Sequence, residues 1–149
     1  FHAPEKLGQR IVVVGGGLVG CEIAYDEVMK GKEVTVVEAL ADIMAAGGAA
    51  PLPNLMMIKA EFAARGVPVL TETRVTEIKP DGVFVTDKEG NTSEIPADTI
   101  VNALGFKPVN TLAAELEKLG MRVITIGDAL GAANILKAVA DGYAAANNI

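Results

Sequence analysis

The sequence is poor in cysteine, histidine and tryptophan. Its 149 residues include one cysteine, one histidine and no tryptophan. A single cysteine excludes an intrachain disulfide and a metal cluster held by several thiolates. Cys21 lies among residues expected to form a helix, so we expect buried packing, with a reactive thiol as the alternative. His2 lies in a short leader, and we therefore expect no histidine base.

Long apolar runs and an excess of positive charge are also missing. No apolar run approaches the roughly 20 residues that cross a bilayer, and no basic segment followed by an apolar stretch stands near residue 1. The formal net charge of −6 disfavours binding to nucleic-acid phosphates or anionic membranes. We expect a soluble, cytoplasmic protein that binds neither nucleic acid nor membrane. The length fits one ordinary domain or a piece of something larger.

The N-terminal third alternates short β-branched runs with segments of helical period. Residues 11–14 and 33–37 have the pattern of buried strands, and residues 18–30 between them predict a helix. This β-α-β unit of about 30 residues implies parallel pairing of its strands. After a loop rich in glycine and proline, the sequence predicts a second helix at 55–65 and a third strand in the letters VPVL.

The rest of the chain predicts a different arrangement. Residues 74–97 alternate apolar and polar side chains around two turn signals, PDG and KEGN, which indicates a three-stranded antiparallel meander. The segment DTIVNALG again has the pattern of a buried strand. Beyond it we expect a helix at 110–119, a strand at 122–128 and an Ala-rich helix at 134–147. The predicted fold class is α/β, a Rossmann-like three-layer dinucleotide-binding fold with helices on one face of a parallel sheet and the meander beside it.

A glycine motif, GGGLVG, follows the first strand. Gly15, Gly17 and Gly20 fit G-x-G-x-x-G: the first permits a tight turn, the second lets a pyrophosphate approach, and the third lets helix and strand pack closely. Unpaired amides near Leu18 and Val19 then face the ligand from the positive end of the helix dipole. Close packing without any ligand is the alternative explanation for the glycines.

An acidic residue at the end of the second predicted strand supports the prediction of a dinucleotide ligand. Glu38, in VTVVEA, comes about 20 residues after the motif, where a carboxylate can accept hydrogen bonds from ribose hydroxyls and repel a 2′-phosphate. No arginine directly follows it, so NAD(H) is favoured over NADP(H). An ordinary solvated carboxylate is the alternative. Glu22 could reach the nicotinamide end or complement the helix N-terminus, and the sequence does not decide between these roles.

Five segments, in order, resemble the C-terminal part of NADH:flavin oxidoreductases of the 2-enoate reductase and 2,4-dienoyl-CoA reductase type. They are IVVVGGGLVGCE, VTVVE, the meander, DTIVNALGFKPVN and VITIGDALGAANILKAVADGYAAANNI. The resemblance implies a module of the two-dinucleotide-binding-domain flavoproteins, in which an NAD(H) domain is inserted into an FAD domain. It implies a leader at 1–8, an NAD(H)-binding domain at 9–106 and, at 107–149, a segment resembling the end of the FAD-binding domain.

The resemblance also extends the candidate site. The NALG segment lies where the chain leaves the NAD(H) domain, so its backbone passes near the dinucleotide. Asp128 in IGDA matches the acid that binds the ribityl or pyrophosphate region of FAD. The candidate cofactor-binding residues are therefore Gly15, Gly16, Gly17, Leu18, Val19, Gly20, Glu38, Ala39, Ala103, Leu104, Gly105 and Asp128. We predict no catalytic residue and no metal ligand.

The chain departs from that family in two respects. It has one glycine fingerprint, whereas the family has an earlier one for FAD, and the family's (β/α)₈ barrel with FMN and an iron–sulfur cluster is absent. We therefore expect a fragment of a larger enzyme, or a natural reduced relative, that is inactive in isolation. It would bind NAD(H) and position NADH for hydride transfer to FAD, with FAD bound only in the full-length enzyme.

Partners and competing functions follow from this interpretation. The expected partners are a dinucleotide and the rest of the parent flavoenzyme, namely its FAD domain and FMN barrel. A homodimer is a further expectation, because residues 123–149 would expose apolar surface without an FAD domain. One alternative is a stand-alone nucleotide-binding or redox-sensing module whose loop at 45–54 reports on NADH. Another is FAD binding in the single pocket.

Overall fold

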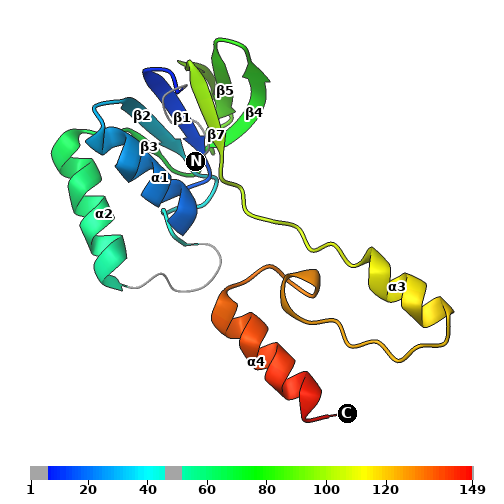
Figure 1. Cartoon of the computed structure of the whole chain (residues 1–149). Helices are drawn as coiled ribbons and strands as arrows, with labels where there is room; N and C mark the ends of the chain where they lie inside the picture. Colours follow the sequence, from blue (N-terminus) through cyan, green and yellow to red (C-terminus); the bar gives the residue numbers. More distant parts are fainter. Residues whose placement is uncertain (1–6, 46–51, 149) are drawn as a thin grey trace. The chain divides into compact units, whose positions relative to one another are not determined.

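The computed structural model describes residues 7–45 and 52–148, and the chain divides into two compact units (Figure 1). The units are Phe1–Leu104 and Gly105–Ile149. The predicted domain boundary after residue 106 lies two residues beyond this division, and the cofactor that each unit binds stays a prediction. Residues 46–51 of the loop assigned to the sensor alternative lie outside the described residues.

The first unit has the alternation of strands and helices that the sequence predicts. Its elements are β1 (Arg10–Val14), α1 (Leu18–Met29), β2 (Glu33–Val37), α2 (Leu52–Arg65), β3 (Val69–Leu70), β4 (Arg74–Lys79), β5 (Gly82–Thr86), β6 (Thr92–Pro96) and β7 (Thr99–Asn102). Helix α2 begins three residues before the predicted start. Pro53 is compatible with this because the first turn of a helix has no intrahelical acceptor for its N–H groups.

Four strands form a parallel sheet in the order β3-β2-β1-β7. Strand β1 is central: Val13 pairs with Val36 of β2 on one side and with Val101 of β7 on the other. The valine runs suit this position because a parallel sheet is covered on both faces. Parallel strands end at one edge, so the segments after β1, β2 and β7 all begin there. This edge brings together the glycine motif, Glu38 and Ala103.

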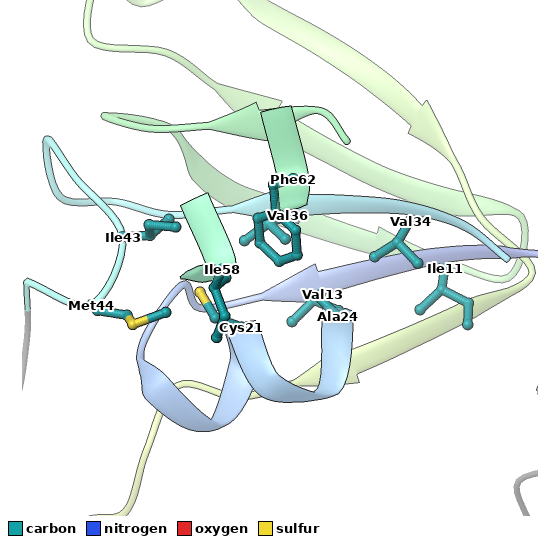
Figure 2. Close-up of a cluster of buried hydrophobic side chains, with 10 residues drawn as sticks. All are labelled: Ile11, Val13, Cys21, Ala24, Val34, Val36, Ile43, Met44, Ile58 and Phe62. Atoms are coloured by element: carbon teal, nitrogen blue, oxygen red, sulfur yellow. The ribbon is translucent and has the colours of Figure 1, made fainter. Parts of the chain in front are cut away.

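The two faces of the sheet carry different layers. Side chains alternate along β1, so Ile11 and Val13 pack with α1 and α2, while Val12 and Val14 pack with Val83 of the meander. Figure 2 shows the helical side, where Cys21 and Ala24 of α1 and Ile58 and Phe62 of α2 meet the strands. Strands β4, β5 and β6 form the separate antiparallel sheet. The predicted three-layer α/β fold is confirmed.

The second unit contains α3 (Thr111–Lys118), a 3₁₀ helix (Gly127–Ala129) and α4 (Ile135–Ala146). The prediction of a strand at 122–128 is wrong: residues 122–126 have no regular structure and the 3₁₀ helix follows. The described part of this unit contains no strand with which that segment could pair, and a strand requires a paired backbone. None of the unit's described residues is buried. Among the described residues, no helix has the length and apolar character to span a membrane.

Candidate functional site

The glycine motif makes the turn that leaves β1 at the carboxyl edge of the sheet. Gly15 has a φ of +108°, which L side chains rarely adopt, and its N–H donates to the carbonyl of Val37 at 2.9 Å. A Cβ at Gly15 would lie 2.6 Å from the carbonyl oxygen of Ala103. The N–H of Ala103 in turn donates to the carbonyl of Val14 at 2.8 Å. The turn is therefore closed by β2 on one side and by the end of β7 on the other.

Gly20 and Gly17 lie in contrasting surroundings. A Cβ at Gly20 would overlap the carbonyl oxygen of Gly15 and lie 3.1 Å from the Cβ of Ala103, so only glycine lets α1 approach the strand this closely. A Cβ at Gly17 would meet nothing within 4 Å. The protein interior therefore explains the glycine at position 20 and does not explain the one at position 17. The space in front of Gly17 is where the motif would admit a ligand.

The first turn of α1 presents backbone donors to this space. Gly17 is the N-cap and supplies no side chain, and the N–H of Cys21 is the first to bond within the turn, to the carbonyl of Gly17 at 2.9 Å. The N–H groups of Leu18, Val19 and Gly20 have no acceptor in the described part of the chain. The first turn carries no acidic residue that would compensate the positive end of the helix dipole. An anion can therefore bind here without a lysine or an arginine.

Glu38, directly after β2, is buried and turned toward the glycine motif. Its side chain accepts the N–H of Gly16 on Oε2 and the N–H of Leu40 on Oε1, each at 2.7 Å. The residue is 8% exposed, so it is not the solvated carboxylate of the alternative interpretation. Each carboxylate oxygen has a second lone-pair direction, which leaves acceptor capacity for ribose hydroxyls. The arrangement therefore fits the sugar next to a diphosphate held at Gly17.

The turn after β2 folds back over the motif, which the sequence does not predict. The N–H of Met44 donates to the carbonyl of Gly16 at 2.6 Å, and the Sγ of Cys21 lies 3.3 Å from the same oxygen. Burial raises the pKa of the Cys21 thiol to about 12, with a smaller contribution from the nearby carboxylates of Glu38 and Asp42. The thiol stays protonated near neutral pH, so the packing role holds and the reactive-thiol alternative is disfavoured.

A cleft of about 480 Å³ lies beside this turn. Its lining comes from the turn after β2, the start of β4 and the end of β5: Ala39, Leu40, Ala41, Glu72, Arg74, Thr86, Asp87 and Lys88. Sequence reasoning found only Ala39 among these. The signal was available, because Glu72 and Arg74 come just after β3, whose carboxyl end lies at the same edge of the sheet as that of β2.

The remaining predicted residues occupy several places. Leu104 is exposed, and its N–H donates to the Oδ1 of Asn102 at 3.2 Å. Gly105, with a φ of +82°, is the first residue of the second unit. Asp128 lies in the 3₁₀ helix of that unit, where its Oδ1 accepts the N–H of Ala133 at 3.3 Å. The first unit thus assembles the motif, Glu38, Ala39 and Ala103, and Asp128 belongs to the other unit. In the described ranges, no cluster of three potential metal ligands is present.

Known proteins share this fold and sequence pattern. The family model for pyridine nucleotide-disulphide oxidoreductases matches residues 2–132. An NADH oxidase of Thermoanaerobacter brockii is 42% identical over 91% of the chain, and a cinnamate reductase of Clostridium sporogenes is 34% identical over 97%. The chain spans 20% and 22% of those two proteins.

Experimental structures agree with the fold. The 2-naphthoyl-CoA reductase complex with 2-naphthoyl-CoA superposes with a TM-score of 0.73 and 31% identity, over 93% of this chain and 21% of that one. Histamine dehydrogenase from Rhizobium sp. 4-9 has a TM-score of 0.79 at 22% identity, over 98% of this chain and 24% of that one. The second likeness establishes the fold alone. Both structures extend well beyond the segment that this chain matches.

Proposed function

The chain belongs to the pyridine nucleotide-disulphide oxidoreductase family, and on that premise we propose that it is the NAD(H)-binding part of a flavin-dependent oxidoreductase. Members of this family use NAD(H) and FAD. The observation that carries the proposal is the pairing of free N–H donors at the start of α1 with the buried carboxylate of Glu38. Leu18 and Val19 would bind the diphosphate through their N–H groups, and Glu38 would accept from the ribose hydroxyls. NADH bound there supplies a hydride.

The larger enzyme that we propose is of the 2-enoate reductase type. Two relatives support this: one is named cinnamate reductase, and another is the 2-naphthoyl-CoA reductase. Both enzymes are named after unsaturated carboxyl compounds. In this proposal residues 9–106 form the NAD(H)-binding domain and residues 107–149 complete the FAD-binding domain, with Asp128 facing FAD. We propose that the isolated chain is inactive because FAD, the electron acceptor, is bound only in the full-length enzyme. We also propose a cytoplasmic location.

The second unit supports a partner within the parent polypeptide. Its described residues include none that is buried, and Phe106, Ile135 and Leu136 are each more than three-quarters exposed. Large exposed apolar side chains that gather in one unit mark a surface where a partner binds. Because this chain spans only 20% and 22% of the NADH oxidase and the cinnamate reductase, we assign that cover to the remainder of the flavoenzyme. The homodimer stays a prediction, which sedimentation of the 149-residue chain would test.

Calorimetric titration of the chain with NADH and NADPH tests the proposed function. We expect NADH to bind at least about fivefold more tightly than NADPH, since repulsion between a carboxylate and a phosphate near a protein surface costs about 1–4 kcal/mol. Glu38→Gln should weaken NADH binding and reduce the difference in affinity between NADH and NADPH. Glu33→Gln is the matched control, because Glu33 is an exposed carboxylate at the opposite end of β2.

Three results would contradict the proposal or favour an alternative. Tighter binding of NADPH, or binding of neither nucleotide, would overturn it. Flavin absorbance in the purified chain would favour FAD in this pocket. The stand-alone sensor has no supporting observation here, because most of its loop lies outside the described residues.

A further inference from the structure

Backbone hydrogen bonds join the turn after β2, which contains Glu38, to the segment before β4, and both segments line the cleft. The N–H of Thr73 donates to the carbonyl of Glu38 at 3.0 Å, and the N–H of Glu72 donates to the carbonyl of Leu40 at 2.8 Å. These bonds hold the segment between β3 and β4 against the turn. A ribose bound by Glu38 through its hydroxyls carries its base on the adjacent ring carbon. The base of that nucleotide must therefore lie within one sugar's width of this carboxylate.

The two walls of the cleft differ in chemistry. The turn contributes small and apolar side chains, which are those of Ala39, Leu40 and Ala41. The opposite wall is charged and carries two cations, Arg74 and Lys88, and two carboxylates, Glu72 and Asp87. A volume of about 480 Å³ lies within the range of sites that bind small ligands.

The charged side chains of the cleft differ in the partners they have among the described residues. The Nζ of Lys88 bonds to the Oε2 of Glu72 at 2.6 Å, and the Asp87 carboxylate accepts from the N–H and the side-chain amide of Asn91. The guanidinium of Arg74 makes no ion pair or side-chain hydrogen bond with any residue in the ranges that the structure describes. Arg74 is exposed and lines the cleft, so a ligand there could reach its guanidinium.

We propose that Arg74 binds the adenine ring of the nucleotide by stacking its guanidinium on one face of the ring. This inference rests on the proposed binding of NAD(H). The guanidinium is planar and weakly hydrated, so it stacks on aromatic faces where a lysine ammonium cannot. The alanines of the turn leave room for the opposite face of the ring. Arg74 is then a determinant of the base that the site accepts, separate from the ribose contact of Glu38.

The test compares Arg74→Ala and Arg74→Lys with the wild-type 149-residue chain. Calorimetry measures the affinity for NADH and for ADP-ribose, which keeps the adenylate half and lacks nicotinamide. We expect Arg74→Ala to weaken both ligands equally, by about tenfold, which is a typical value for one stacked base. Arg74→Lys should restore little of this loss. Arg65→Ala is the matched control, because Arg65 is an exposed arginine paired with Glu61 at the end of α2.

The outcomes separate this inference from the proposed function. If the wild type binds NADH and Arg74→Ala behaves like Arg65→Ala, the inference is wrong and the proposed function stands. Full affinity in Arg74→Lys would assign the effect to charge and overturn the stacking role. If the wild-type chain binds neither ligand, the proposed function fails, and the inference fails with it.

Discussion

Replacement of Gly17 by alanine separates ligand binding from folding at the glycine motif. The residue has extended backbone angles, φ −68° and ψ 177°, which any residue can adopt. The added Cβ would meet no protein atom within 4 Å. Loss of glycine at an N-cap costs roughly 0.5–1 kcal/mol, and the reduced entropy of the unfolded chain offsets about 0.4–1 kcal/mol. We therefore expect the free energy of unfolding to change by no more than about 0.5 kcal/mol.

The same methyl group should interfere with NADH. It projects into the space in front of the free N–H groups of Leu18 and Val19, where the diphosphate would lie. An N–H···O bond to a phosphate needs about 2.9 Å between heavy atoms, which leaves no room for an intervening methyl. Loss of one hydrogen bond to a charged group costs about 1.5–3 kcal/mol, which corresponds to about 10- to 150-fold weaker binding.

Two measurements on the variant check both halves of this prediction. Urea unfolding followed by circular dichroism gives the stability, and calorimetric titration with NADH gives the affinity. Gly131→Ala is the control, because its Cβ would also meet nothing within 4 Å and it lies in the second unit. If Gly17→Ala binds NADH within twofold of the wild type, the assignment of the diphosphate to this turn is wrong. That conclusion would hold whatever the stability of the variant.

Further predictions concern stability and reactivity. Gly20→Ala should lower the free energy of unfolding by about 1–3 kcal/mol in a urea titration, because its Cβ overlaps the carbonyl oxygen of Gly15; an unchanged midpoint would contradict the close packing. The Arg10 guanidinium, through hydrogen bonds, lowers the pKa of Asp98 to about 2 from 3.8. The resulting stabilisation is present above pH 4 and is lost as pH falls toward 2. In urea titrations, the difference in free energy of unfolding between wild type and Asp98→Asn should therefore shrink over that window and stay constant above it. Cys21, with a pKa of about 12, should resist a thiol reagent at pH 8 until the chain unfolds, and rapid labelling of the native protein would refute its burial.

The parallel sheet and its covering layers could be predicted because they depend on local patterns. The valines of β1 and β2 require cover on both faces, and the alternation in residues 74–97 requires one covered face. The same reasoning failed for residues 122–128. These have the composition of a strand, but a strand forms only where another backbone pairs with it, and no strand lies in the described part of their unit. Pairing is a property of the whole fold and is not encoded in seven residues.

The candidate site could be predicted only in part, for a related reason. The position of Glu38 at the end of β2 follows from the sequence, and its orientation does not. Its hydrogen bond to the N–H of Gly16 joins residues 22 positions apart and depends on the register between β1 and β2. The position of Arg74 just after β3 was an available signal, but its place in the cleft also depends on the pairing of β3 with β2 in the sheet.

The hydrogen bonds of Glu38 also explain how an acidic residue can share an anion site. A free carboxylate near the start of α1 would compete with a diphosphate for the same N–H donors. Glu38 instead takes the N–H of Gly16, which precedes the N-cap, and leaves those of Leu18 and Val19 to the ligand. A Cβ at Gly16 would lie 2.9 Å from the side chain of Ile43 and 3.0 Å from that of Glu38, so a side chain there would disturb this division. The side chains of Ile43 and Glu38 therefore explain the glycine at position 16, while the glycine at position 17 is left for the ligand to explain.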